Sequence, residues 1–211
     1  MISGAAAVCL MALGVLLFAE EQADARLKWI AKPAASLAFV ALAYFAGALE
    51  TTYGQLILAG LVLCLAGDVF LIPRAKGLFL AGMGAFALGH LAYLGAFATI
   101  WSGFGAGAII ATVVLTGFVF IVLRQLWPHL NEFRIPVAVY CLIITAMAAT
   151  SFGTQSPAGG SPYWLVVAGA VGFAISDIAV ARDQFYRREF FNRLWGLPLY
   201  YGSQLLLAAS V

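Results

Sequence analysis

Hydrophobic residues follow one another along this chain in long runs, separated by short polar connections. Eight such runs can be counted, and each is about as long as an α-helix must be to cross a lipid bilayer. They cover residues 2–19, 33–49, 56–72, 78–101, 104–127, 135–152, 163–181 and 194–211. The connections are too short to hold a soluble domain, and only helices satisfy their own backbone polar groups in lipid. The pattern therefore predicts an all-α, polytopic membrane bundle of eight transmembrane helices, with residues 1–211 as a single domain.

Composition supports the same fold class. Hydrophobic residues make up 64% of the chain and charged residues 9%, whereas soluble domains carry about 25% charged residues. The net charge of +2 is too small to indicate a nucleic-acid partner. Cys9, Cys64 and Cys141 lie inside apolar runs without metal-ligand spacing, so they are interpreted as packing residues.

The basic residues all fall in the odd-numbered connections or beside them. They are Arg26, Lys28, Lys32, Arg74, Lys76, Arg124, Arg134, Arg182, Arg187, Arg188 and Arg193. By the positive-inside rule this side is cytoplasmic. The sequence thus predicts an integral protein of the bacterial inner membrane, with both termini outside and with its polar site opening to the cytoplasm.

Two carboxylates interrupt the apolar runs. Asp68 lies in "CLAGDVFLIP" and Asp177 in "VGFAISDIAVAR", each four residues before the end of a run that crosses from outside to inside. A rise of 1.5 Å per residue places each acid about 6 Å below the cytoplasmic boundary, on parallel helices. Ionisable groups in transmembrane segments are costly and commonly mark functional sites. The alternative is structural: each acid pairs with a loop arginine, Arg74 or Arg182.

Further polar residues converge on the same half of the membrane. His90 and Tyr93 are one turn apart on one helix face, and Gln204 follows Tyr200 and Tyr201 at helical spacing. His90 is either a proton-relay or ligand residue or a packed core histidine, and Lys32 is either a phosphate contact or a topology signal. The predicted substrate-binding residues are Lys32, His90, Tyr93, Tyr140, Asn192, Tyr200, Tyr201 and Gln204.

The chain also has a weak internal similarity. "KP" opens the second run and "RIP" the sixth, and in each half the next run carries the aspartate. Four spans per half would make the bundle a 4+4 parallel repeat, as in some transporters.

Six motifs in order resemble the lysoplasmalogenase family, the YhhN-like membrane proteins: "KP", "GDVFL", "GHLAYL", "IPVAVY", "ISDIAVA" and "LPLYYGSQLLLA". The resemblance covers the chain from about Lys32 to Ala208. It implies an eight-span enzyme that hydrolyses the vinyl-ether bond of lysoplasmalogens to a fatty aldehyde and a glycerophospho-alcohol. The motif match carries the family's acidic pair onto Asp68 and Asp177, and its other positions onto His90, Tyr93, Tyr200, Tyr201 and Gln204.

Such a reaction suits a pair of carboxyls. Protonation of a vinyl ether at its β-carbon gives an oxocarbenium ion, which water captures. One carboxyl, kept protonated, would donate the proton, and an ionised partner would stabilise the cation, as in glycosidases. The sequence does not say which of Asp68 and Asp177 plays which part, and it predicts no metal and no other cofactor.

Two other functions use the same residues. In a metallohydrolase, Asp68, Asp177 and His90 would bind a divalent ion, although catalytic zinc sites are commonly richer in histidine. In a proton- or cation-coupled small-molecule transporter, the acids would form a relay, although the outer half of the membrane offers almost nothing titratable. A membrane scaffold without chemistry would leave both acids unexplained. The partners expected are the lysophospholipid substrate and membrane lipid.

Overall fold

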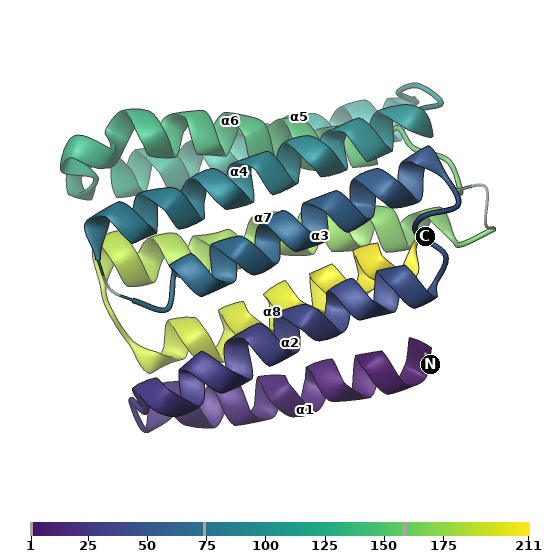
Figure 1. Cartoon of the computed structure of the whole chain (residues 1–211). Coiled ribbons are helices and arrows are strands. Elements are labelled where there is room, and N and C mark those ends of the chain that lie inside the picture. The colour runs from purple at the N-terminus through teal and green to yellow at the C-terminus, as the bar shows by residue number, and fades with distance from the viewer. Residues whose placement is uncertain (1, 74, 158–159) are drawn as a thin grey trace.

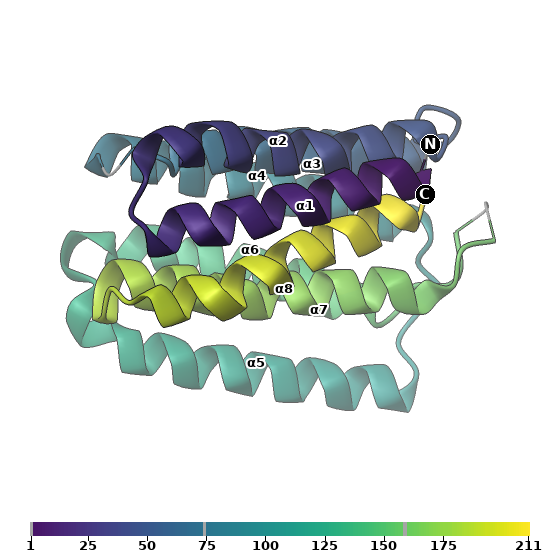
Figure 2. The same cartoon turned by 90° about the horizontal axis from the view of Figure 1, so that it is seen from below.

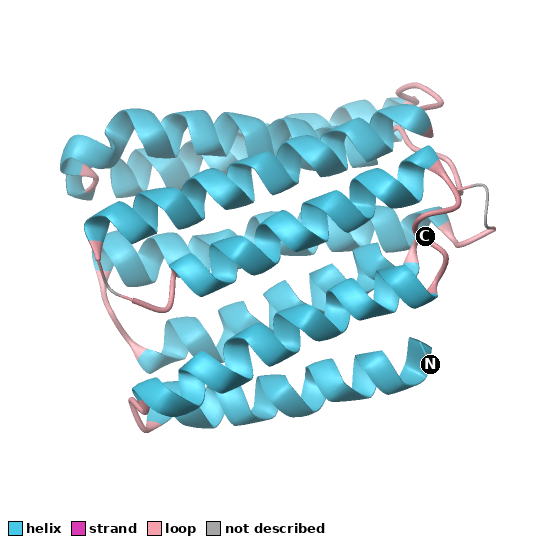
Figure 3. Ribbon diagram, in the orientation of Figure 1, coloured by secondary structure: helices cyan, strands magenta, loops and turns pink. Residues whose placement is uncertain are grey.

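The computed structural model describes residues 2–73, 75–157 and 160–211, and the long elements of these segments are all α-helices (Figure 3). In chain order the helices are α1 (Ile2–Glu21), α2 (Ala25–Phe45), α3 (Thr52–Phe70), α4 (Lys76–Thr99), α5 (Ala106–Leu126), α6 (Arg134–Ser151), α7 (Tyr163–Ala181) and α8 (Phe190–Ala209). Two short 3₁₀ turns, η1 (Trp127–His129) and η2 (Asn131–Phe133), precede α6, and a π-helical turn, η3 (Arg182–Tyr186), follows α7. The all-helical fold class and the eight helices predicted from the apolar runs are confirmed.

Helix α2 begins eight residues before the apolar run that predicted it. The carboxylate of Asp24 accepts hydrogen bonds from the backbone N–H groups of Arg26 and Leu27, and this cap starts the helix ahead of its basic residues. Pro33, expected to open the span, therefore lies inside the helix. As a consequence Lys32 stands about two turns after the start of α2.

The eight helices run antiparallel to their chain neighbours, so both termini lie at one end of the bundle (Figure 1). The connections that follow α1, α3, α5 and α7 all lie at the other end. This end, which we call the basic end, carries the arginines and lysines named above, except Arg74, which lies outside the described residues.

Consecutive helices pack in pairs, most extensively α1 with α2, α3 with α4, and α7 with α8. Helix α8 also packs against α1 and α2, and α4 packs against α6. Helix α5 lies at one edge of the bundle, where it packs chiefly on α6 (Figure 2). The polar helices α2 and α8 are thereby brought together in the interior, while α5 has little more than one helical neighbour.

Among the residues that the structure describes, six helices are long and apolar enough to cross a membrane by themselves. The other two are α2 and α8, which carry several of the buried polar side chains: Lys32, Ser36, Asn192, Ser203 and Gln204. Several glycines let the helices approach closely. A Cβ at Gly172 would lie 2.4 Å from Oγ of Ser203, and one at Gly67 would lie 2.8 Å from the ring of Phe86. The chain is an integral membrane protein whose polar groups are gathered inside the bundle.

Candidate active site

A cavity of about 140 Å³ opens between α4, α5, α6, α7 and α8. Its wall is mostly apolar, but Asp68 and Asp177 both line it, together with Lys32, Tyr140 and Tyr200. The two acids come from α3 and α7, which run parallel and end at the basic end. Two carboxyls that are 109 positions apart in sequence therefore meet the same small volume.

Asp68 is buried and has three partners of its own. Oδ1 lies 3.1 Å from Nζ of Lys32. Oδ2 accepts hydrogen bonds from the hydroxyls of Ser36, at 2.7 Å, and Tyr200, at 2.7 Å. Ser36 follows Lys32 by one helical turn, so both point from the same face of α2. An ion pair and two hydroxyl donors together satisfy an ionised carboxylate in a site without bulk water.

A chain of hydrogen bonds continues behind Tyr200. Nε2 of Gln204 donates to the Tyr200 oxygen at 3.2 Å, and the phenol of Tyr93 donates to Oε1 of Gln204 at 2.8 Å. The hydrogen bonds run from Tyr93 through Gln204 to Tyr200 and on to Asp68, so this series of bonds fixes the orientation of the Tyr200 hydroxyl. The hydroxyl of Tyr201 lies 3.3 Å from Oγ of Ser36 and donates to the carbonyl of Lys32 at 3.4 Å.

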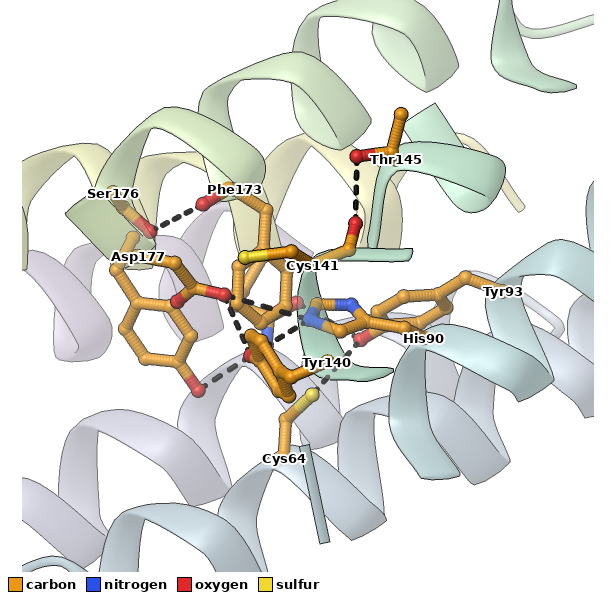
Figure 4. A network of polar contacts seen from close by, with 11 residues as sticks. Cys64, His90, Tyr93, Tyr140, Cys141, Thr145, Phe173, Ser176 and Asp177 are labelled. Atoms are coloured by element: carbon orange, nitrogen blue, oxygen red, sulfur yellow. Dashed lines mark hydrogen bonds and ion pairs between the residues drawn. The ribbon is translucent and has the colours of Figure 1, made fainter. Parts of the chain in front are cut away.

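Asp177 has a different set of partners (Figure 4). The phenol of Tyr140 donates to Oδ2 of Asp177 at 2.6 Å. Nε2 of His90 lies 2.9 Å from the Tyr140 oxygen and 3.5 Å from Asp177 Oδ2. Because the single phenol proton of Tyr140 goes to the carboxylate, Nε2 of His90 must donate to the phenol oxygen. The Asp177 side chain remains 19% exposed, while that of Asp68 is 3% exposed.

The imidazole of His90 is held between aromatic rings. Its ring centroid lies 4.5 Å from that of Phe173 and 5.4 Å from that of Tyr140. Within the described segments Nδ1 has no hydrogen-bond partner. A neutral imidazole that donates through Nε2 leaves Nδ1 as the unprotonated nitrogen, which fits this apolar surrounding.

The surroundings of the two acids correspond to each other. Asp68 on α3 is contacted from α2 and α8, and Asp177 on α7 is contacted from α6 and α4. If α1–α4 are exchanged for α5–α8 in order, then α3 becomes α7, α2 becomes α6 and α8 becomes α4, so one set of contacts becomes the other. A 4+4 repeat predicts this relationship, because each acid then takes one partner from its own half and one from the other half.

The ten residues predicted from the sequence fall into two groups. Six line the cavity: Lys32, Asp68, Tyr140, Asp177, Asn192 and Tyr200. The other four lie behind the wall: His90, Tyr201 and Gln204 each hydrogen-bond to a residue that lines it, and Tyr93 donates to Gln204. Asn192 is buried, and its amide nitrogen donates to the carbonyl of Arg187 at 2.7 Å, so it also braces the start of α8.

Some expected contacts differ. The guanidinium of Arg182, a predicted partner for Asp177, lies 5.5 Å from the centre of the Tyr186 ring. Arg74, the predicted partner for Asp68, lies outside the described residues. The structure instead pairs Asp68 with Lys32, from a helix whose start the apolar pattern placed too late.

Two residues of the site were missed. Ser36 contacts Asp68, and its position four residues after Lys32 was the available signal. Arg193 lines the cavity and pairs with Asp183. It was missed because it was counted only among the basic residues that indicate the orientation of the helices. Among the described residues, no group of three or more histidine, cysteine, aspartate or glutamate side chains is placed to hold a metal ion.

The arrangement suits acid–base chemistry on an amphipathic molecule. One carboxyl is held in an ion pair, and the other is hydrogen-bonded but open to the cavity, so their environments differ. The apolar wall formed by α5, α6 and α7 would accept a hydrocarbon chain.

The model of the YhhN family matches residues 27–211. Bovine lysoplasmalogenase TMEM86A is 33% identical over 158 residues, which are 73% of this chain and 64% of the bovine protein. Human lysoplasmalogenase TMEM86B is 33% identical over 188 residues, which are 88% of this chain and 76% of the human protein.

A bacterial relative is also similar. The lysoplasmalogenase of Mycobacterium tuberculosis (strain CDC 1551 / Oshkosh) is 31% identical over 158 residues, which are 71% of this chain and 58% of that protein. The chain thus spans less than two thirds of the bovine and mycobacterial relatives. No solved structure matches the chain.

Proposed function

The chain belongs to the YhhN family, and from this membership we propose that it hydrolyses the vinyl-ether bond of lysoplasmalogens. The products are a fatty aldehyde and a glycerophospho-alcohol. The single observation that carries the proposal beyond family membership is the cavity, which presents two differently held carboxyls, Asp68 and Asp177, on an apolar wall.

The two acids take different parts. Asp68, with an ammonium and two hydroxyl donors around it, is the ionised member and stabilises positive charge that develops in the substrate. Asp177 has one phenol donor on Oδ2 and is partly open to the cavity, so it is the member that carries and delivers a proton. Tyr140 and His90 hold the Asp177 carboxyl toward the cavity.

The reaction then balances with water as the only co-reactant. The Asp177 carboxyl gives its proton to the β-carbon, the alkene electron pair forms the new C–H bond, and an oxygen lone pair makes the oxocarbenium ion. Water adds to the cationic carbon and loses a proton to the Asp177 carboxylate. In the collapse of the hemiacetal the Asp177 carboxyl gives its proton to the glycerol oxygen, the C–O bond to glycerol breaks, and the hydroxyl proton passes to the Asp177 carboxylate as the aldehyde C=O forms.

The alkenyl chain of the substrate occupies the apolar part of the cavity. Helix α5 supplies much of this wall, with Leu115, Val119 and Leu123 among its lining residues. Since α5 packs chiefly on α6, its other side faces the membrane. A lysolipid can therefore enter with its chain still in an apolar medium, which avoids the cost of exposing that chain to water.

The basic end is cytoplasmic in this proposal, with both termini outside in the inner membrane of a bacterium. The support is the gathering of arginine and lysine at one end of the bundle. Alkaline phosphatase, which is active only outside the cytoplasm, fused to Val211 should be active. If the fusion protein is stable but its phosphatase is inactive, the opposite orientation is indicated.

Incubating the purified protein with a lysoplasmalogen and with its saturated-ether analogue tests the reaction. Aldehyde should appear from the first substrate alone, because a saturated ether has no alkene to protonate. Absence of aldehyde from both substrates, together with counterflow of a solute in liposomes, would favour the transporter instead.

A further inference from the structure

A second cavity, of about 240 Å³, lies at the basic end beside the first one. We call it the vestibule. Its wall is largely polar, unlike that of the cavity that holds the two acids. Five cationic side chains line the vestibule against two carboxylates: Lys28, Lys32, Lys76, Arg188 and Arg193, with Glu20 and Asp183. A polar, cation-rich hollow that adjoins an apolar one has the form expected for an anionic amphiphile.

The two cavities share part of their walls. The residues that line both are Lys32, Leu71, Phe79, Val180 and Arg193. Of the two cationic residues in this group, Lys32 already pairs with Asp68 at 3.1 Å. Arg193 also forms an ion pair, with Asp183, but its guanidinium has further N–H donors for an incoming anion.

The guanidinium of Arg193 is held in place from one side. Nη2 lies 2.5 Å from Oδ2 of Asp183, whose side chain is 5% exposed, whereas that of Arg193 is 29% exposed. The π-helical turn η3 carries Asp183 and wraps back toward the start of α8, where Arg193 stands. A guanidinium has five N–H donors, so this ion pair leaves others free to bind a phosphate.

Two other cations of the vestibule are engaged in ion pairs, and Arg188 lines the vestibule but not the junction with the first cavity. Lys28 lies 2.8 Å from Glu20, and Lys76 lies 2.7 Å from Glu132. The second pair is well exposed to solvent, with side-chain exposures of 62% and 59%, so it contributes little to binding at the junction.

We propose that Arg193 binds the phosphodiester of the lysolipid at the junction of the two cavities, and that Asp183 is the positioning residue that fixes its guanidinium. The inference rests on the proposed function and adds the site that recognises the phosphorylated head group. With the phosphate on Arg193 and the chain in the apolar cavity, the glycerol portion spans the interval in which the acids lie. Arg193 thereby selects phosphorylated vinyl ethers over neutral 1-alkenylglycerols.

Kinetics with two substrates test the selection. Wild-type protein and the variants Arg193→Gln, Arg193→Lys and Asp183→Asn are assayed with a 1-alkenylglycerophosphoethanolamine and with the 1-alkenylglycerol that lacks the phosphate. Arg193→Gln should raise KM for the phosphorylated substrate by at least about tenfold, since a charge-assisted bidentate contact is lost. It should leave kcat/KM for the alkenylglycerol unchanged.

The two milder variants separate contact from positioning. Arg193→Lys keeps the charge but not the fork, and Asp183→Asn keeps the fork but loosens it, so both should give intermediate KM values with kcat retained. Arg187→Gln is the matched control, because Arg187 pairs with Glu189 and lines neither cavity. Equal losses on both substrates in Arg193→Gln, or no loss on either, would overturn the proposal.

Binding is measured separately, so that an inactive enzyme still answers the question. The probes are a saturated 1-alkylglycerophosphoethanolamine, the matching 1-alkylglycerol and inorganic phosphate, each added to protein in nanodiscs. The phosphorylated ether alone should raise the melting temperature of the wild type, and Arg193→Gln should lose this shift. An equal shift from inorganic phosphate would identify a general anion site and reject the lipid head group. If no aldehyde is released but the phosphorylated ether alone raises the melting temperature, the proposed reaction is rejected and the head-group site is kept.

Discussion

Lys32 and Asp68 form a buried ion pair, with Nζ 3.1 Å from Oδ1 and with 8% and 3% of the two side chains exposed. Burial removes hydration from both groups, so each charge depends on the other. Because both residues line the cavity, the ion pair places the Asp68 carboxylate on the cavity wall.

Removing the lysine should be costly to the fold. Lys32→Met leaves the Asp68 carboxylate buried without its counter-charge, and we expect a loss of about 3–5 kcal/mol in the free energy of unfolding. The double variant Lys32→Met/Asp68→Asn buries no charge and should recover most of that stability, yet show no aldehyde release. Thermal unfolding in detergent micelles checks the order. A double variant as unstable as the single one would contradict the ion-pair account.

Substitutions of Asp177 and of Tyr140 should reduce turnover to different degrees. Asp177→Asn removes the proton donor and should abolish turnover in a folded protein. Tyr140→Phe removes only one hydrogen bond to the carboxyl, so we expect kcat to fall on the order of 10–100-fold. Tyr163→Phe, at an exposed position on α7, serves as the control and should be active. Full activity in Asp177→Asn would eliminate the proposed donor.

The apolar wall of the cavity should set the preferred chain length. Val119→Trp on α5 fills part of the cavity, and we expect the ratio of kcat/KM for long over short alkenyl chains to fall at least about tenfold, since a hydrocarbon chain contributes about 0.8 kcal/mol per buried CH₂. Val114→Trp, on the same helix but outside the cavity and 65% exposed, is the matched control. Equal chain preference in both variants would place the chain elsewhere.

Close helix packing behind Tyr93 should be sensitive to one methyl group. A Cβ at Gly60 would lie 2.3 Å from Cε1 of Tyr93, whereas a Cβ at Gly84 meets nothing within 4 Å. We expect Gly60→Ala to reduce the free energy of unfolding by about 1–3 kcal/mol. Gly84→Ala should be neutral or stabilising by roughly 0.5–1 kcal/mol, because glycine is a poor helix former. Melting temperatures of the two variants provide the test.

Metal removal distinguishes the carboxyl mechanism from a metallohydrolase. Protein treated with a strong chelator and then dialysed should release aldehyde at the untreated rate, because the proposed steps use carboxyl groups and water. Elemental analysis of the same sample measures what was removed. A loss of activity that zinc or another divalent ion restores would support the metal-dependent reading of Asp68, Asp177 and His90.

Much of the candidate site was accessible from the sequence, because charge is rare in this chain. Asp68, Asp177 and His90 stand out in apolar runs, where an ionisable group costs free energy and requires a partner. The partners themselves were harder to predict. The apolar pattern started the second helix at Pro33, which hid the position of Lys32 inside α2. The Asp24 cap that starts this helix earlier is a short, local signal within a charged segment.

The sequence by itself determined the number of helices, their order, and the end of the bundle that carries the basic residues. Apolar run length and charge distribution are local properties, and a bilayer converts them directly into spans. Only the tertiary structure decided which side chains meet. The pairing of Lys32 with Asp68, the grouping of Tyr140 and His90 around Asp177, and the turn that brings Asp183 to Arg193 join residues from different helices. These contacts depend on how each helix is rotated and which neighbour it packs against, and that is settled by side-chain packing across the whole bundle.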